Sequence, residues 1–371
     1  MPGSTRPAWP GRLAIIQSRL AALGVQALVV STPHNIFYLC GFRGSAGLLV
    51  ITASVVRLIT DGRYAFFVRQ GMAEGAMAAV ELDRVEKRYD LTLGEVVASL
   101  ALDRVAFEPA HVTVATLRSW ERAAPATSWI PADSIVENLR VIKDAFEIEV
   151  FRRGGALISG VIEALPSLVR AGRTERAVAG DIDEAIANAG FSGPAFETIV
   201  ASGPNSALPH ARPTDRSIGP GDLVVLDFGG VIDGYCVDVT RMSAVGPLSD
   251  RAMALFEAVK VATEAAIAAV RPGIPASDVD KAARDILIAR GLGEAFMHST
   301  GHGLGLDVHE APRVGRSDPE AHELVKPGMV FTIEPGAYIE GTGGVRLEDD
   351  VLVTPTGSEL LTRASRDLLF V

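Results

Sequence analysis

An internal repeat in the second half constrains the fold of this chain more than any other feature. The segment GDLVVLDFG (221–229) aligns with GMVFTIEPG (328–336) at an offset of 107 residues, which places Asp227 on Glu334. Each segment follows two predicted helices and a glycine-containing loop, and each precedes a strand with a second acid, Asp238 or Glu348. The repeat predicts two pseudo-equivalent α/β halves around a shared centre, over about residues 144–360.

Hydrophobic periodicity and capping residues predict the helices of these halves. The spacing predicts helices over about 145–169, 174–188, 251–270 and 277–290. We expect Pro166 to kink or end the first of them, and Thr174 and Ser277 to lie at the starts of the second and fourth.

The first half of the chain alternates strand and helix patterns and contains no dense cluster of His, Asp or Glu. It predicts helices over about 10–23 and 63–77 and strands over 25–32, 47–52 and 56–60. We therefore predict an α/β (α+β) protein with a smaller mixed-sheet domain over residues 1–142 and a larger domain over 143–371.

Composition excludes several classes of protein. With 48% apolar and 22% charged residues the chain is not expected to be disordered, and a net charge of -10 without a basic cluster argues against nucleic-acid binding. The chain has only two cysteines, Cys40 and Cys236, which do not make a disulfide framework or a thiolate metal site. No apolar run approaches about 20 residues, and no secretory h-region is visible, so we expect a cytoplasmic protein without membrane contact.

Four carboxylates interrupt otherwise apolar strand patterns: Asp227, Asp238, Glu334 and Glu348. A buried carboxylate is costly unless it is paired, protonated or bound to metal, and four that converge would repel one another. A pair of divalent cations is the simplest remedy, because carboxylate oxygens suit Mn²⁺ or Mg²⁺ and are accepted by Zn²⁺ and Co²⁺. Strand alternation places Cys236, Asp238 and Thr240 on one face, where the Thr240 hydroxyl can support the Asp238 carboxylate.

Histidines gather in the two loops of the repeat, at 210, 298, 302 and 309. Imidazoles suit a two-metal site or contact with a substrate, and the glycines at 301, 303 and 305 let the backbone approach the centre. Each acid alone would more readily be interpreted as a cap or salt-bridge residue. GHGLG alone could be a phosphate loop, but it lacks the Lys and Ser of that motif. We expect His34, His111 and His322 to be structural or exposed.

Together these residues resemble the pita-bread metallopeptidases, which include methionine aminopeptidase, Xaa-Pro aminopeptidase and Xaa-Pro dipeptidase. The family pattern is two Asp eleven positions apart, a His in a GHG loop and two Glu, matched here by Asp227, Asp238, His302, Glu334 and Glu348. His309 lies seven residues after His302, and His210 seventeen before Asp227, as in the family. HSTGHGLGLDVHE and GGVRLED resemble the proline-directed branch, and NIFYLCGFRGSAGLLVI with TDGRY resembles the creatinase/prolidase N-terminal domain. Leu347, Cys40 and Arg43 depart from the usual wording at positions that are not catalytic.

The resemblance implies a role for each residue. Asp227 would chelate one metal ion, Asp238 and Glu348 would bridge two, and His302 and Glu334 would complete the second. Glu334 would also take a proton from the attacking water, while His309 and His210 would donate hydrogen bonds to the substrate carbonyl. His298 would line the proline pocket. Arg346 would orient acids or reach a substrate carboxylate, with a surface ion pair to Asp349 or Asp350 as the alternative.

The resemblance implies dimetal hydrolysis of the bond between an N-terminal residue and proline in short peptides. Mn²⁺ is the expected ion, with Co²⁺ or Zn²⁺ as alternatives, and a homodimer is expected. The short N-terminal region favours an Xaa-Pro dipeptidase (prolidase), and an Xaa-Pro aminopeptidase (aminopeptidase P) is the alternative. A creatinase-like amidinohydrolase or a non-catalytic binding module on the same fold would be expected to lack these ligands.

Overall fold

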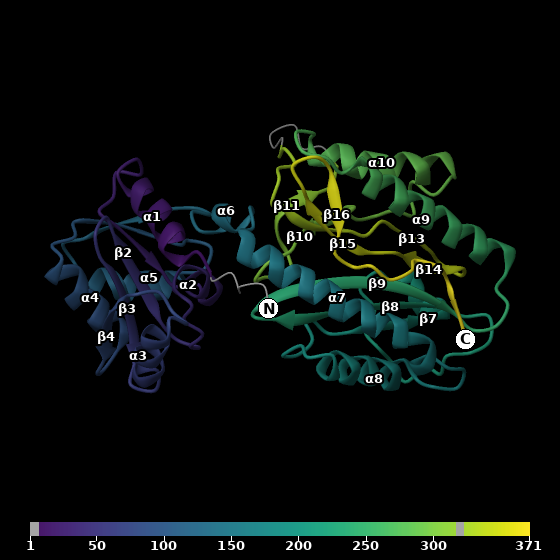
Figure 1. Ribbon diagram of the computed structural model, residues 1–371, viewed down its shortest axis with the longest axis horizontal. Helices are drawn as coiled ribbons and strands as arrows, with labels where there is room; N and C mark the ends of the chain where they lie inside the picture. Colours follow the sequence, from purple (N-terminus) through teal and green to yellow (C-terminus); the bar gives the residue numbers. More distant parts are fainter. Residues whose placement is uncertain (1–6, 317–322) are drawn as a thin grey trace. The chain divides into compact units, whose positions relative to one another are not determined.

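The computed structural model describes residues 7–316 and 323–371, which include every predicted site residue but not His322. The chain divides into two compact units, with the boundary between Arg140 and Val141. Figure 1 labels the elements of both units along the chain. Within the described ranges, no helix is long and apolar enough to cross a membrane.

The first unit is built on one mixed sheet with strand order β4-β3-β2-β1-β5-β6. β1 pairs antiparallel with β2 and parallel with β5, so the sheet combines a meander with crossover connections. Its elements are α1 (Trp9–Leu20), β1 (Ala27–Val30), α2 (Pro33–Cys40), β2 (Leu48–Thr52), β3 (Val56–Asp61), α3 (Ala65–Glu74), β4 (Glu81–Val85), α4 (Tyr89–Ser99), β5 (Arg104–Phe107), α5 (Val114–Ala123), β6 (Ser128–Pro131) and α6 (Glu137–Arg140).

The predicted strands of this unit are confirmed, but its helices are shorter than predicted. α1 ends at Leu20 rather than near 23, because residues 21–24 form a turn in which Gly24 takes a positive φ of 65°. α3 ends at Glu74 because Gly75 adopts the left-handed conformation and its N–H caps the last turn. The sequence signal for both ends was glycine.

The second unit contains two sheets with strand orders β17-β9-β8-β7 and β11-β10-β12-β15-β16, and the hairpin β13-β14. Its helices are α7 (Ala145–Leu168), α8 (Glu175–Asn188), α9 (Asp250–Ala269) and α10 (Ala276–Ala289), with the short 3-10 helix η1 (Gly203–Ala207). Its strands are β7 (Ile199–Ser202), β8 (Leu223–Ile232), β9 (Tyr235–Ala244), β10 (Gly301–Gly303), β11 (Glu310–Val314), β12 (Val330–Ile333), β13 (Gly336–Ile339), β14 (Gly343–Arg346), β15 (Asp349–Val353), β16 (Ser358–Leu360) and β17 (Leu369–Phe370).

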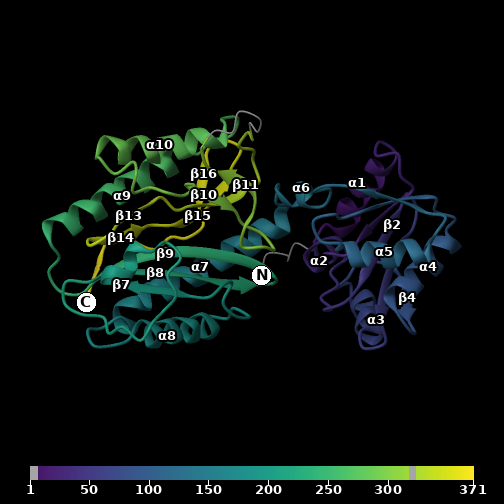
Figure 2. The ribbon, with the colours of Figure 1, turned by 180° about the vertical axis from the view of Figure 1, so that it is seen from behind.

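The predicted repeat is visible in how the helices flank these strands. Both ribbon views place α7 and α8 along one side of the strands and α9 and α10 along the other (Figures 1 and 2). α7 starts at an Asp144–Glu147 capping box and ends two residues after Pro166, and the Thr174 side chain caps α8 as predicted. The predicted cap at Ser277 is wrong, because α10 begins at Ala276 behind Pro275 and has no side-chain cap.

The two halves differ where the repeat carries its acids. β8 and β9 form an unbroken hairpin with Asp227 and Asp238 inside the strands. In the second half the ladder stops at Ile333–Asp349 and resumes between β13 and β14, so Glu334 and Glu348 lie between strands rather than within them. Pro335 supplies the reason, because it has no N–H to donate to a ladder.

The backbone groups freed by this break bond to both halves. The Glu334 N–H donates to the Thr300 carbonyl (2.6 Å), and the Glu348 N–H donates to the Thr240 carbonyl on β9 (3.2 Å). The break therefore turns two acids of the second half toward the acids of the first.

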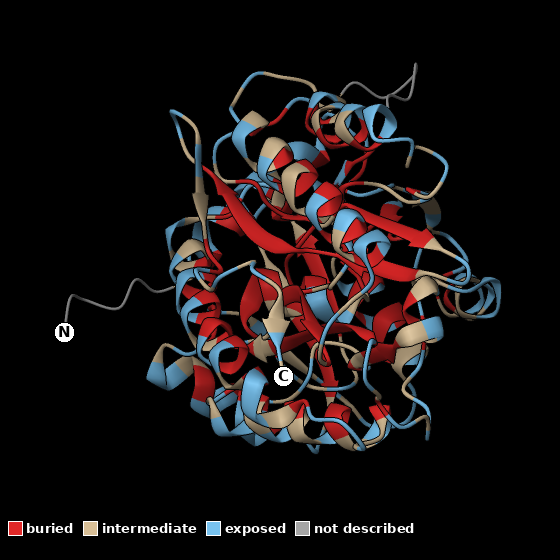
Figure 3. Cartoon of the chain, turned by 90° about the vertical axis from the view of Figure 1, so that its right-hand side faces the viewer, coloured by how far each residue is buried: buried red, intermediate tan, exposed pale blue. Residues whose placement is uncertain are grey.

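Apolar side chains of the helices and strands form the core of the second unit, which includes Val259 on α9, Val279 on α10 and Phe331 on β12. Figure 3 shows these strands as buried and the helices as exposed on their outer surfaces. On α7, the Phe151 ring packs edge-on against Tyr235 at a centroid distance of 5.7 Å. The carboxylates of the repeat are thus held by a rigid scaffold.

We expect Gly155→Ala, in the middle of α7, to lower the free energy of unfolding by about 1–3 kcal/mol. A Cβ at Gly155 would overlap the backbone carbonyl of Leu361, which cannot move as a side chain can. Gly160 lies on the exposed face of the same helix with open space around it, so Gly160→Ala should leave stability unchanged or raise it slightly. Urea unfolding of both variants checks this, and equal effects would contradict it.

Candidate metal centre

A cavity of about 390 Å³ in the second unit collects the predicted site residues. Its lining includes all nine of them: His210, Asp227, Asp238, His298, His302, His309, Glu334, Arg346 and Glu348. They come from β8, β9, β10, the end of β14, the links after β12 and before β15, and three loops. Residues up to 138 positions apart in sequence therefore meet at one site, as the repeat predicted.

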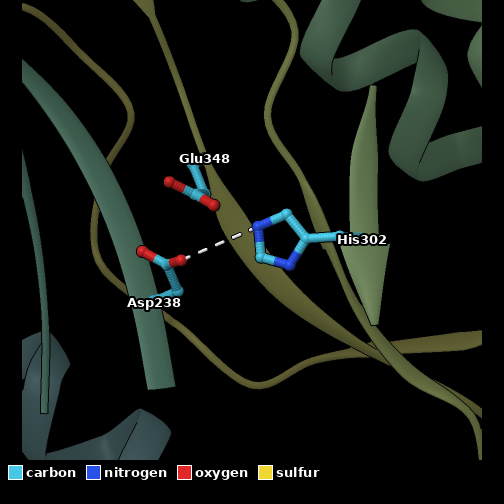
Figure 4. A group of neighbouring side chains, drawn as sticks. All are labelled: Asp238, His302 and Glu348. Carbon is cyan, nitrogen blue, oxygen red and sulfur yellow. Dashed lines mark ion pairs between the residues drawn. The ribbon is translucent and has the colours of Figure 1, made fainter. Parts of the chain in front are cut away.

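Three of these residues converge closely enough to share one ion. The ligand atoms of Asp238, His302 and Glu348 lie within 4.8 Å of one another, and Figure 4 shows both carboxylates turned toward the imidazole. His302 Nε2 is 3.9 Å from Asp238 Oδ2 and 3.4 Å from Glu334 Oε1. Three of the five predicted ligands thus converge on one point, and Glu334 approaches the same imidazole.

His302 is prepared to act as a neutral ligand. Its Nδ1 lies 3.3 Å from the carbonyl of Gly303, which favours a proton on Nδ1 and leaves the Nε2 lone pair facing the acids. Burial, and then the neighbouring His309, lower the pKa of His302 to about 4. Gly301 makes this placement possible, because a Cβ there would overlap the Thr332 carbonyl on β12.

The acids of the cavity cannot all be charged without a counter-ion. Burial, followed by the charges of Glu348 and Asp227, raises the pKa of Asp238 far above its usual range. Burial, followed by the charges of Glu334 and Asp227, does the same for the pKa of Glu348. Burial also raises the pKa of Glu334 to about 8, with Asp227 adding to the shift. At neutral pH these groups hold protons or bind cations.

The unsatisfied oxygens of the site fit divalent cations. Among the described residues, Asp227 Oδ1, Asp238 Oδ1 and Glu348 Oε1 are buried without a hydrogen-bond partner in the protein. Native proteins pair almost all such atoms, so three in one cavity indicate a missing partner. Carboxylate oxygens with one imidazole are a donor set that Mn²⁺, Co²⁺ and Zn²⁺ accept. The residues present therefore fit a metal centre.

Arg346 joins these acids to the second half of the unit. The buried guanidinium pairs with Asp227 and donates to Thr240 Oγ1 (3.1 Å), the Tyr338 hydroxyl (2.7 Å) and the Pro209 carbonyl (3.1 Å). The alternative, a surface ion pair to Asp349 or Asp350, is wrong, because both acids are buried and Asp349 pairs with Arg241 and Arg366. Arg346 stays charged and holds Asp227 in place.

The predicted hydroxyl support is present but serves a different acid. Thr240 Oγ1 donates to Glu348 Oε2 (2.6 Å), not to Asp238. The Asp238 carboxylate instead faces the cavity, while its own N–H donates to Asp350 Oδ2 (3.2 Å). The reason is the break before β15, which brings Glu348 over β9.

The remaining histidines line the cavity from three loops. His210 and His309 are exposed, and the rings of His309 and His302 lie 4.0 Å apart. His298 is partly buried; its Nδ1 lies 2.8 Å from the Ser299 carbonyl and its Nε2 3.0 Å from the Tyr338 hydroxyl. Burial lowers the pKa of His298 to about 4, so this ring is neutral.

Sequence reasoning missed several residues of the site. Arg313 on β11 and Phe196 line the cavity, and Tyr338 joins His298 to Arg346. Buried Glu175 accepts hydrogen bonds from both the backbone and the side chains of Ser202 and Thr214, and so fixes the loop that leads to His210. None of these residues lies in a motif, although Arg313 is only four positions after His309.

Two family models account for most of the chain. Residues 12–142 match the Creatinase/Prolidase N-terminal domain, and residues 149–355 match Metallopeptidase family M24. The chain belongs to metallopeptidase family M24. It is therefore a metallopeptidase, and divalent metal use is a property of the family.

Full-length relatives agree with this family. The Xaa-Pro dipeptidase of Pyrococcus horikoshii is 32% identical over 347 residues, which cover 93% of this chain and 95% of the relative. The solved Xaa-Pro dipeptidase from Bacillus anthracis has a TM-score of 0.93 and 31% identity, with 98% and 100% of the two chains covered. The X-Pro aminopeptidase from Thermotoga maritima has a TM-score of 0.87 and 32% identity, with 95% and 100% covered. The predicted pita-bread fold and the Xaa-Pro branch of the family are confirmed.

Proposed function

We propose that this metallopeptidase hydrolyses the bond between an N-terminal residue and proline, with two divalent cations held by Asp227, Asp238, His302, Glu334 and Glu348. The observation that carries the proposal is the cavity that gathers these five side chains around unpartnered, buried carboxylate oxygens. The names of the relatives, Xaa-Pro dipeptidase and X-Pro aminopeptidase, support the substrate class.

Bound cations would polarise the scissile carbonyl and acidify a water. The chain's own groups do the rest. Glu334, which the cations would keep ionised, accepts a proton from the attacking water and returns it to the proline nitrogen as the C–N bond breaks. His210 and His309, exposed in the cavity, donate hydrogen bonds to the developing oxyanion. His298 lies beside Tyr338 on the proline side, and Arg346 holds Asp227.

The length of peptide that the cavity accepts depends on which protein group binds the C-terminal carboxylate of the substrate. The Arg346 guanidinium already binds protein groups. Arg313 also lines the cavity, but its side chain is exposed, and its Nε donates to Ser299 Oγ (2.9 Å). We propose a dipeptidase in which Arg313 binds the substrate's C-terminal carboxylate, with an aminopeptidase that takes longer peptides as the alternative.

We expect Arg313→Ala to raise KM for Ala-Pro by about 10- to 100-fold, because a charge-assisted hydrogen bond of about 1.5–3 kcal/mol is lost. Cleavage of Ala-Pro-amide, which has no carboxylate, should change little. Steady-state kinetics on both substrates measures this selectivity, and exposed Arg316, outside the cavity lining, offers the matched control Arg316→Ala. Equal losses on both substrates would contradict carboxylate binding by Arg313.

The proposed function is tested with protein stripped of metal and reconstituted with Mn²⁺. Ala-Pro, Ala-Pro-Ala and a longer X-Pro peptide are compared with Ala-Ala and Met-Ala-Ser. Cleavage of Ala-Pro only supports the dipeptidase, and cleavage of the longer peptides supports the aminopeptidase. The proposal fails if no X-Pro peptide is cleaved in a metal-dependent way.

We further propose that residues 1–142 and 143–371 are the two domains, a cytoplasmic homodimer is the working form and Mn²⁺ is the native ion. The division of the chain beside Arg140 and the family matches that meet near 142–149 support the boundary. The carboxylate-rich ligand set supports Mn²⁺, with Co²⁺ or Zn²⁺ as alternatives.

A further inference from the structure

A buried ion pair on α10 lies outside the cavity and contacts the segment that carries His298 and His302. The Asp280 carboxylate accepts from Arg284 Nε and Nη2, both at 2.8 Å, in a two-point pairing. Asp280 is 1% exposed and Arg284 9% exposed. Neither residue lines the cavity, so neither contacts the substrate.

This pair also forms hydrogen bonds with the backbone of residues 296–300. Asp280 Oδ1 accepts from the Thr300 N–H (3.1 Å) and from Thr300 Oγ1 (2.9 Å). Arg284 donates to the carbonyls of Phe296 (3.1 Å) and His298 (3.0 Å), and its guanidinium lies 4.0 Å from the centroid of the Phe296 ring. One turn of α10 therefore fixes residues 296–300.

The fixed segment reaches the proposed metal ligands directly. The carbonyl of Thr300 accepts from the Glu334 N–H (2.6 Å), and His302 follows two residues later, with its N–H bonded to Thr332 Oγ1 (3.1 Å). Thr300 thus lies between Asp280 on one side and the backbone of two ligands on the other.

We propose that Asp280 and Arg284 are positioning residues that set the placement of His302 and Glu334 for metal binding. This inference rests on the proposed function of the cavity. A buried ion pair contributes little net stability compared with well-packed apolar residues, because removing both charges from water is costly. Partners that orient metal ligands, in contrast, change metal affinity strongly when they are removed.

The test compares Asp280→Asn and Thr300→Val with wild type in full-length protein. We expect the Kd for Mn²⁺, measured by calorimetry, to rise by about 10- to 100-fold in both variants. We also expect kcat for Ala-Pro to fall while KM changes less than about threefold, since the substrate contacts remain. Thr300→Ser, which keeps the hydroxyl, should restore the wild-type Kd.

Two controls on the same helix separate positioning from stability. Leu287→Ala removes a buried core side chain and lowers the Tm, but should leave the Kd for Mn²⁺ unchanged. Asp285→Asn breaks the exposed Lys281–Asp285 pair, which has the same four-residue spacing, and should change neither quantity.

The outcomes decide between the two proposals. Wild-type Kd and kcat in Asp280→Asn and Thr300→Val, or equal losses in Leu287→Ala at the same Tm, would overturn the positioning role and leave the proposed function standing. A wild-type protein that neither binds Mn²⁺ nor cleaves X-Pro peptides would overturn the proposed function and this inference with it.

Discussion

Asp238→Asn is expected to abolish metal-dependent cleavage of X-Pro peptides, with a fall in kcat/KM of about 10³-fold or more, or about 4 kcal/mol of transition-state stabilisation. Asp238 is buried on β9, and its ligand atom lies within 4.8 Å of those of His302 and Glu348. The amide keeps the shape of the side chain, but it removes the negative charge and leaves one oxygen instead of two to bind a metal ion. The measurement is kcat/KM for Ala-Pro across a Mn²⁺ titration.

The fold should survive this substitution. Asp238 Oδ1 has no partner among the described residues, and repulsion from Glu348 and Asp227 disappears in the amide. We therefore expect the metal-free variant to melt at or above the wild-type Tm. Asp233→Asn, in the exposed turn of the same hairpin, is the matched control and should retain full activity. An Asp238→Asn protein with activity within tenfold of wild type would contradict the assignment of Asp238 as a ligand.

Spacing and residue type were enough to predict which acids and histidines meet in the cavity. The repeat placed Asp227 over Glu334, and apolar flanks marked both as unusual for buried strands. The sequence pattern did not show that Glu334 and Glu348 lie in a break between strands. Pro335 was the available signal, because its missing N–H interrupts a ladder at that point.

Long-range partners could not be predicted from the sequence. Asp280 and Arg284 are four residues apart on a helix, as are Lys281 and Asp285 one position later. Both pairs look like exposed helix pairs in the sequence, yet the structure buries one and exposes the other. Burial depends on the packing of α10 against distant segments, and periodicity gives only an approximate face of the helix. Arg346 is similar, since its partners Asp227, Thr240 and Pro209 lie more than 100 residues away.

The metal-free protein is expected to lose stability as the pH rises from about 6.5 to 8. Below about 6.5 the buried His298 and His302, whose folded pKa values are lowered to about 4, act in the opposite direction. Glu334 has an ordinary pKa near 4.5 when unfolded and about 8 when folded, so the folded state holds the extra proton between these values. A group whose folded pKa is raised adds stability below its unfolded pKa and loses it as the pH rises through the folded value. Asp238 and Glu348, with pKa values raised in the same direction, add to the loss.

Thermal melts from pH 6.5 to 8, with and without saturating Mn²⁺, measure this effect. The metal-free Tm should fall by about 5 °C or more over this range, since about 1 kcal/mol corresponds to about 2–4 °C for a domain of this size. Mn²⁺ should raise the Tm most at pH 8, because the ions bind only the folded state and replace protons on the acids. Glu334→Gln carries no titrating group at this position, so its metal-free Tm should depend less on pH and exceed that of wild type at pH 8. A metal-free wild-type Tm that rises steadily from pH 6.5 to 8 would show that these acids are not buried together in the folded state, and would contradict the proposed metal centre.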